Sequence, residues 1–146
     1  MRIEGDDMRA KSYSAVVMGM AFLTGVAGCS GGDGIAAIDR SATSEDQLPS
    51  YVSTESLDVD SVRLVAEHDG IAYFISRPAD GSGFCVIRIP DRIQTVWAAA
   101  CGQGGNVVST SSIGISQSVT LVTDGYSTSD LEKVGWEKIT DNLLVR

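Results

Sequence analysis

The sequence predicts a mainly β fold, namely a small antiparallel meander, sandwich or partly open barrel with one short helix. Sixteen glycines, many serines and threonines, and an aromatic content of 6% are unlike a helical bundle. From about residue 59 onward, short apolar stretches alternate with turn signals roughly every eight to twelve residues, which is typical of such β folds. A length of 146 residues indicates one domain of this kind.

The individual strands follow from alternation and turn chemistry. A β-like run begins at 61–66, and the Asp69-Gly70 pair predicts a hairpin turn before a return strand at 71–77. A Gly-rich turn then precedes a third strand that ends before Pro90. This third strand is expected at 84–89, and the remaining strands are expected at 95–101, 107–108, 117–123 and 139–145.

Alternation also assigns the faces of the third strand. Cys85, Ile87 and Ile89 share one face, so Arg88 points to water if Cys85 points inward. Near the C-terminus, Ser129 or Asp130 can begin one short helix. The run 136–145 then predicts a closing strand.

An export signal precedes this domain. Arg9 and Lys11 form a short positive region before an uncharged apolar run of twelve residues at 15–26. As a helix the run would span about 18 Å, whereas a bilayer core requires about 30 Å. It therefore fits a signal peptide better than a transmembrane helix. The acidic residues of 1–7 do not suit a leader, and we expect translation to begin at Met8.

The apolar run ends in Val26, Ala27, Gly28 and Cys29. These residues resemble the lipobox of bacterial lipoproteins, in which an aliphatic residue, a small residue, and Gly or Ala precede Cys. The resemblance implies cleavage between Gly28 and Cys29 and a diacylglycerol on the Cys29 sulfur. Residues 1–28 are then a signal peptide, and the chain is anchored by lipid to the extracytoplasmic face of the cell membrane. An ordinary secretory signal and a retained N-terminal anchor are the alternatives.

A flexible linker is expected between the lipid and the domain. Residues 29–58 are rich in glycine, serine and acidic residues and show little apolar periodicity. A disordered segment of this length reaches on the order of 30 Å. Residues 35–38 can form a helical turn, but one that is too short to be stable alone. The β-rich extracytoplasmic domain is expected over 59–146.

Export also predicts a disulfide between Cys85 and Cys101. The two residues lie on matching faces of neighbouring predicted strands. Thiols outside the cytoplasm usually oxidise, and lipidation of Cys29 leaves these two as the one possible pair. Two free buried thiols are the alternative.

The formal net charge of −8 argues against nucleic acid as a partner. The three basic and three acidic residues of 1–28 cancel, so the exported chain keeps the whole charge. His68, the single histidine, is expected in an exposed turn beside Glu67 and Asp69. With no Gly-x-Ser-x-Gly motif and two paired cysteines, we expect no catalytic residue, no metal site and no cofactor.

The most plausible ligand surface involves aromatic and basic residues. An exposed cationic stripe next to a tyrosine would suit an anionic wall polymer, although a core aromatic and a solvated strand face are the simpler interpretation. The candidate residues are Tyr73, Arg77, Arg88 and Tyr126.

The leading functional hypothesis is a lipid-anchored cell-envelope protein with a small non-catalytic binding domain. Its partner would be a cell-wall polymer or another envelope protein, and we expect a monomer. One alternative is a small envelope hydrolase or an accessory subunit of an envelope enzyme. Another is a protein that inhibits or shields an envelope protein.

Residues 61–146 also resemble small secreted or lipid-anchored domains of high-GC Gram-positive bacteria. The similar features are the stretch 62–70 with Tyr73, the Gly-x-Cys at 83–85, the Ala-Cys-Gly at 100–102, and the stretch 121–126. These motifs are turns and a cysteine pair, so the resemblance implies a type of structure rather than an activity.

Overall fold

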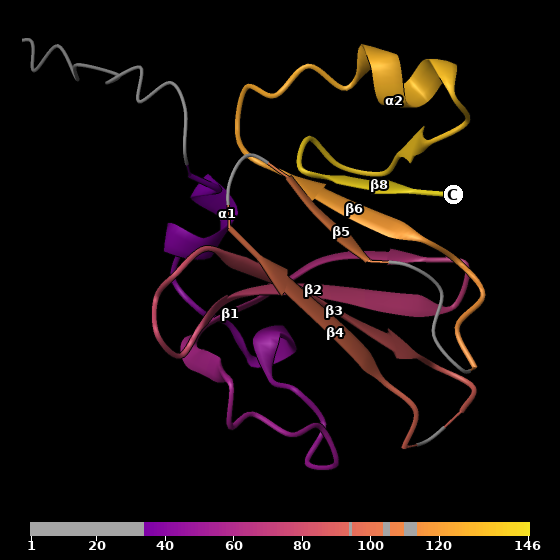
Figure 1. Ribbon diagram of the computed structural model, residues 1–146. Coiled ribbons are helices and arrows are strands. Elements are labelled where there is room, and N and C mark those ends of the chain that lie inside the picture. The colour runs from indigo at the N-terminus through magenta and orange to yellow at the C-terminus, as the bar shows by residue number, and fades with distance from the viewer. Residues whose placement is uncertain (1–33, 94, 104–105, 110–113) are drawn as a thin grey trace, which may run out of the picture.

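The computed structural model describes residues 34–93, 95–103, 106–109 and 114–146. It confirms the predicted fold class, because two antiparallel four-stranded sheets make up most of it (Figure 1). The first sheet has the order β1-β2-β3-β4, with bounds Leu57–His68, Ile71–Pro78, Phe84–Pro90 and Ala98–Gly102. The second has the order β5-β6-β8-β7, with bounds Asn106–Ser109, Val119–Val122, Leu143–Val145 and Glu137–Lys138. The helices are α1 (Ala36–Asp39), η1 (Ser44–Asp46) and α2 (Ser129–Lys133).

The turn between β1 and β2 is the one that the sequence predicts. Asp69 and Gly70 have φ angles of 51° and 73°, as the mirror-image hairpin turns require. The turn places His68 opposite Ile71 at the end of the ladder. The turn therefore sets the register of the adjoining part of the hairpin, from Ala66 to His68.

The two sheets pack face to face through one apolar cluster. Tyr73, Ile75 and Val86 of the first sheet are buried with side chains of β6 and β8. The partners from the second sheet are Val119, Leu121, Leu143 and Val145. Burial of side chains this size is worth about 1.5–3 kcal/mol each, so this layer is a main source of stability.

The opposite face of the first sheet is also covered. Cys85, Ile87 and Ile89 pack against apolar side chains from the segment that precedes β1 and from the start of β1 itself, among them Val52 and Leu57. Every residue of β3 is consequently buried. The prediction that Arg88 points to water was wrong, because alternation separates the two faces of a strand but does not say which faces are covered.

The prediction of a flexible linker was wrong for residues 34–57, which are folded. Ile35 and Ile38 are 1% and 3% exposed and belong to the core between the sheets. The segment then passes through η1 and contributes Val52 to the second cluster. The segment is mostly polar, but it contains a few apolar side chains that pack against residues far away in the sequence.

Asp124, in the turn after β6, holds the beginning of this segment. Its carboxylate accepts a hydrogen bond from the Ala36 backbone N–H at 2.7 Å, and its own N–H donates to the Gly34 carbonyl at 2.9 Å. The other carboxylate oxygen accepts from the Asn142 side chain at 2.7 Å. A helix of four residues is thus stabilised by tertiary contacts rather than by its own propensity.

The C-terminal region agrees with the sequence prediction in part. The predicted helix is present as α2, directly after Thr128. The prediction of a single closing strand at 136–145 was wrong, because the chain forms two short antiparallel strands, β7 and β8, with a turn between them. The Thr140, Asp141 and Asn142 sequence favours that turn over a continuous strand.

The predicted disulfide between Cys85 and Cys101 is present. The two residues are direct partners in the β3–β4 ladder, and Cys85 is fully buried. The bridge joins β4, an edge strand, to β3, in which every residue is buried. No helix among the described residues is long and apolar enough to cross a bilayer.

Removing this bridge should destabilise the domain. The bridge joins residues 16 apart in sequence, and a loop of that size is worth about 3 kcal/mol in the chain-entropy model. We expect Cys85→Ala/Cys101→Ala to lower the free energy of unfolding by at least about that amount, measured by urea denaturation. Reductant should destabilise the unmodified protein and leave the double variant unchanged. Equal urea midpoints for the two proteins would contradict the prediction.

Candidate functional site

Two of the four predicted ligand-surface residues lie inside the protein. Tyr73 and Arg88 are 0% exposed, and they face each other across β2 and β3 between the two sheets. The Tyr73 hydroxyl donates to the side-chain oxygen of Gln117, and Arg88 Nη1 donates to the backbone carbonyl of Gln117. The prediction of an exposed cationic stripe was therefore wrong.

Burial also changes the ionisation of this pair. Burial raises the pKa of Tyr73 to about 12, an effect that the nearby Arg88 opposes and Asp69 reinforces. Burial lowers the pKa of Arg88, against the attraction of Tyr73. Tyr73 thus remains a neutral hydrogen-bond donor at physiological pH and serves the packing of the sheets.

The other two predicted residues are at the surface but do not form one site with them. Arg77 is half-exposed, lies 3.6 Å from the Asp39 carboxylate, and stacks over the Phe84 ring at 5.3 Å. Tyr126 is 42% exposed in the connection between β6 and α2.

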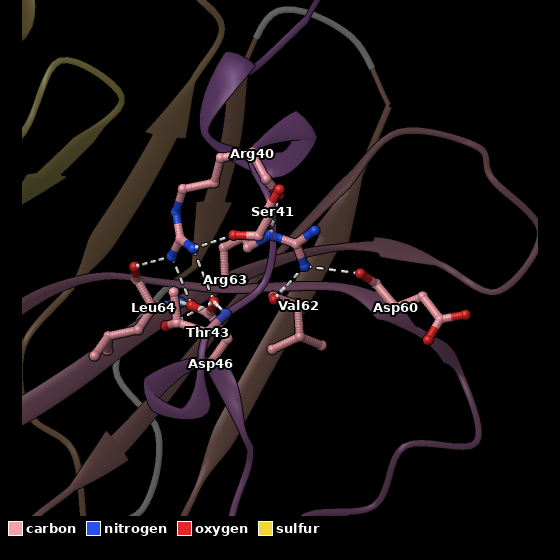
Figure 2. A network of polar contacts seen from close by, with 8 residues as sticks. All are labelled: Arg40, Ser41, Thr43, Asp46, Asp60, Val62, Arg63 and Leu64. Carbon is pink, nitrogen blue, oxygen red and sulfur yellow. Dashed lines mark hydrogen bonds and ion pairs between the residues drawn. The ribbon is translucent and has the colours of Figure 1, made fainter.

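A network of polar contacts near the surface centres on Asp46 (Figure 2). Its side chain is 3% exposed and pairs through both oxygens with Arg40 at 2.6 and 2.8 Å. It also accepts hydrogen bonds from the backbone N–H and the hydroxyl of Thr43, and from the backbone N–H of Leu64 at 2.7 Å. The hydrogen bonds from Arg40 are the main reason that the pKa of Asp46 lies well below its usual range.

This network closes the open edge of the first sheet. β1 is an edge strand, and its Leu64 donates to Asp46 and accepts from Arg40 Nη2 at 3.1 Å. Arg63 adds a second tie, because its Nε donates to the Arg40 carbonyl at 2.9 Å. An edge strand with unpaired backbone groups invites pairing with other chains. Here one ion pair satisfies the backbone N–H and carbonyl of Leu64 and holds the N-terminal segment against the strand.

Next to this network lies an open cleft of about 460 Å³. Leu48, Val59 and Val62 form its apolar part, and Val59 is 55% exposed. Ala42 adds a methyl group, and the remaining lining is polar and consists of Thr43, Asp46, Gln47, Thr54 and Asp60. Since Asp46 is already paired with Arg40, Asp60 is the carboxylate of the lining that a ligand would meet.

The β1 backbone is irregular where it borders the cleft. The pairing with β2 shifts register between Asp58 and Arg63, so this part of the strand leaves the ladder. Arg63 Nη1 holds the resulting bend by donating to the carbonyls of Asp60 and Val62, both at 2.7 Å. Such bulges turn side chains to new directions, and this one turns Val59 toward solvent.

Sequence reasoning missed Arg40, Asp46 and the cleft. One usable signal was present, because Thr43 and Asp46 have the spacing with which a hydroxyl residue and an acidic residue cap a helical turn. Nothing local predicts Arg40 or Leu64 as partners, since these contacts join residues that are up to 24 apart in sequence.

His68 lies at the end of β1 rather than in the turn itself, with its side chain 24% exposed. Its Nε2 is 3.3 Å from the carboxylate of the adjacent Asp69. In the part of the chain that the structure describes, no three histidine, cysteine or acidic residues group as metal ligands.

No protein-family model, curated protein or solved structure significantly matches this chain.

Asp46→Asn should destabilise the domain by about 2–4 kcal/mol at neutral pH, because it removes the buried carboxylate that pairs with Arg40 and accepts hydrogen bonds from Thr43 and Leu64. The folded pKa is depressed, so this stabilisation is present above the unfolded pKa and is lost as the pH falls through the folded value. The difference in the free energy of unfolding between the variant and the unmodified protein should therefore become smaller in acid. Urea denaturation from pH 7 to pH 2 measures this difference.

Asp130→Asn is the matched control for this substitution. Asp130 pairs with Lys133 at 2.8 Å, but its side chain is 93% exposed. A surface pair of this type contributes about 0–1 kcal/mol. Similar losses in the two variants would contradict a special role for Asp46.

Proposed function

We propose that this chain is a lipid-anchored extracytoplasmic protein whose folded domain is a non-catalytic binding module. Val26, Ala27, Gly28 and Cys29 support the anchor, because they match each position of the lipobox pattern. The Cys85–Cys101 disulfide is consistent with a location outside the cytoplasm. The cleft beside Val59 supports a binding role.

The main support for a binding role is that the cleft has one wall held by hydrogen bonds and an accessible apolar surface. The Asp46 network holds one wall in place, so little conformational entropy need be lost on binding there. Leu48, Val59 and Val62 offer apolar contact, and Asp60 offers a negative charge. This chemistry suits an apolar side chain flanked by a cationic or hydrogen-bond-donating group.

We accordingly favour a segment of another envelope protein as the ligand over an anionic wall polymer. The chain carries a net charge of −8, and the cleft lining contains acidic but no basic residues. A polyanion would meet electrostatic repulsion at this surface, whereas a cationic peptide would be attracted to it.

The anchor is tested by Cys29→Ala in the full-length chain. Without the thiol no thioether to lipid can form, so we expect the protein to move from the membrane fraction to the soluble fraction. The Cys85–Cys101 disulfide, checked by non-reducing mass mapping, serves as the control for folding. Retention of the variant in the membrane fraction would refute the lipid anchor.

The cleft is tested with a photo-crosslinking amino acid in place of Val59 in intact cells. We expect a discrete crosslinked product because Val59 is exposed beside the proposed ligand site. The same amino acid in place of Val134, which is 62% exposed and lies directly after α2, is the matched control.

A second substitution links the product to the cleft. Thr54 is an exposed residue of the lining, so Thr54→Arg should obstruct the site without disturbing the core. Loss of the product in that background would support the proposal. Equal products at Val59 and Val134, or a product that Thr54→Arg does not change, would refute it.

A further inference from the structure

The point at which the chain enters the folded domain is held firmly. Gly34 and Ala36 both hydrogen-bond to Asp124, and Ile35 between them is 1% exposed in the core. Asn142 holds the same carboxylate from the turn between β7 and β8. The start of the domain is therefore attached to the turn after β6 and to the core, and Asp124 links it to the turn between β7 and β8.

Only Ser30, Gly31, Gly32 and Asp33 separate this point from Cys29. A fully extended chain spans at most about 3.6 Å per residue, so the Cα atoms of Cys29 and Gly34 are at most about 18 Å apart. The polar headgroup layer takes up roughly 5–8 Å of that length on each side of a bilayer. A lipid on the Cys29 sulfur would thus hold Gly34 close to the headgroups.

The surface around this entry point is suited to a polar lipid interface. A shallow hollow of about 580 Å³ lies beside α1 and is bordered by the turns after β6 and β7. We call this surface the α1 face; its residues include Ala36, Ala37, Asp124, Tyr126, Lys138 and Asn142. Tyr126 is exposed, and tyrosine is enriched at membrane interfaces because its ring is apolar and its hydroxyl is polar.

Each acidic side chain in the lining of the α1 face has a polar partner beside it. Lys138 brings an ammonium group that lies 2.8 Å from the Asp141 carboxylate. The Asp124 carboxylate is satisfied by Ala36 and Asn142. A zwitterionic headgroup layer carries no net charge, so it can meet such a surface without net electrostatic repulsion.

We propose that the α1 face lies against the phospholipid headgroups, with Tyr126 in contact with them. This inference rests on the proposed lipid anchor at Cys29. It also gives the domain an orientation, because η1 and the loop that follows it lie away from the connection between β6 and α2 (Figure 1). The Val59 cleft is then directed away from the membrane and remains open to a partner.

The test compares two tyrosine-to-cysteine variants of the full-length lipidated protein in phosphatidylcholine vesicles. Tyr126→Cys lies on the α1 face, and Tyr51→Cys lies in the loop after η1 at similar exposure (42% and 37%). Each variant should contain one free thiol, because Cys29 carries lipid and the other cysteines are paired. The readout is the rate of reaction with a membrane-impermeant maleimide, in vesicles and after solubilisation in detergent.

We expect Tyr126→Cys to react several-fold more slowly in vesicles than in detergent, and Tyr51→Cys to react equally in both. A long Gly/Ser spacer inserted between Asp33 and Gly34 should abolish the protection of Tyr126→Cys, because the domain could then leave the surface. Protection that persists with the spacer would refute the role assigned to the short connection.

Flotation with the vesicles separates the two levels of the proposal. If both variants float in a Cys29-dependent manner but each reacts at the same rate in vesicles and in detergent, the orientation is wrong and the anchor stands. If the unmodified protein neither carries lipid nor floats, the anchor and the orientation are both refuted.

Discussion

The Asp46 carboxylate is the contact on which the rest of the structure most depends. It binds Arg40 within its own segment and Leu64 on β1, so it joins the N-terminal segment to the open edge of the first sheet. A carboxylate is suited to this place because it accepts several hydrogen bonds at once. Without the contact, one wall of the Val59 cleft would lose support and the backbone groups of Leu64 would lose their partners.

A second polar arrangement aligns the two sheets with each other. Tyr73 and Arg88 of the first sheet both donate to Gln117, which precedes β6 of the second. Apolar packing between sheets tolerates small displacements, whereas hydrogen bonds have narrow geometry. Buried polar groups of this kind impose a cost when they are unsatisfied, so they favour one alignment over its neighbours.

The folded N-terminal segment changes how the domain would be presented to its surroundings. A flexible linker of 29–58 would let the domain sample many orientations at a distance from the membrane. With Ile35 and Ile38 in the core, the connection to Cys29 shortens to four residues. The same segment supplies one wall of the cleft, so presentation and binding depend on the same contacts.

The sequence by itself determined the mainly β fold, the Asp69-Gly70 hairpin, the position of α2 and the Cys85–Cys101 pair. Each depends on alternation, on turn chemistry or on residues that are close in the chain. Only the tertiary structure decided that 34–57 is folded, that Arg88 and Tyr73 are buried, and that Arg40, Asp46 and Leu64 meet. The physical reason is that burial depends on which surfaces cover a strand, and those surfaces come from residues that no local pattern connects.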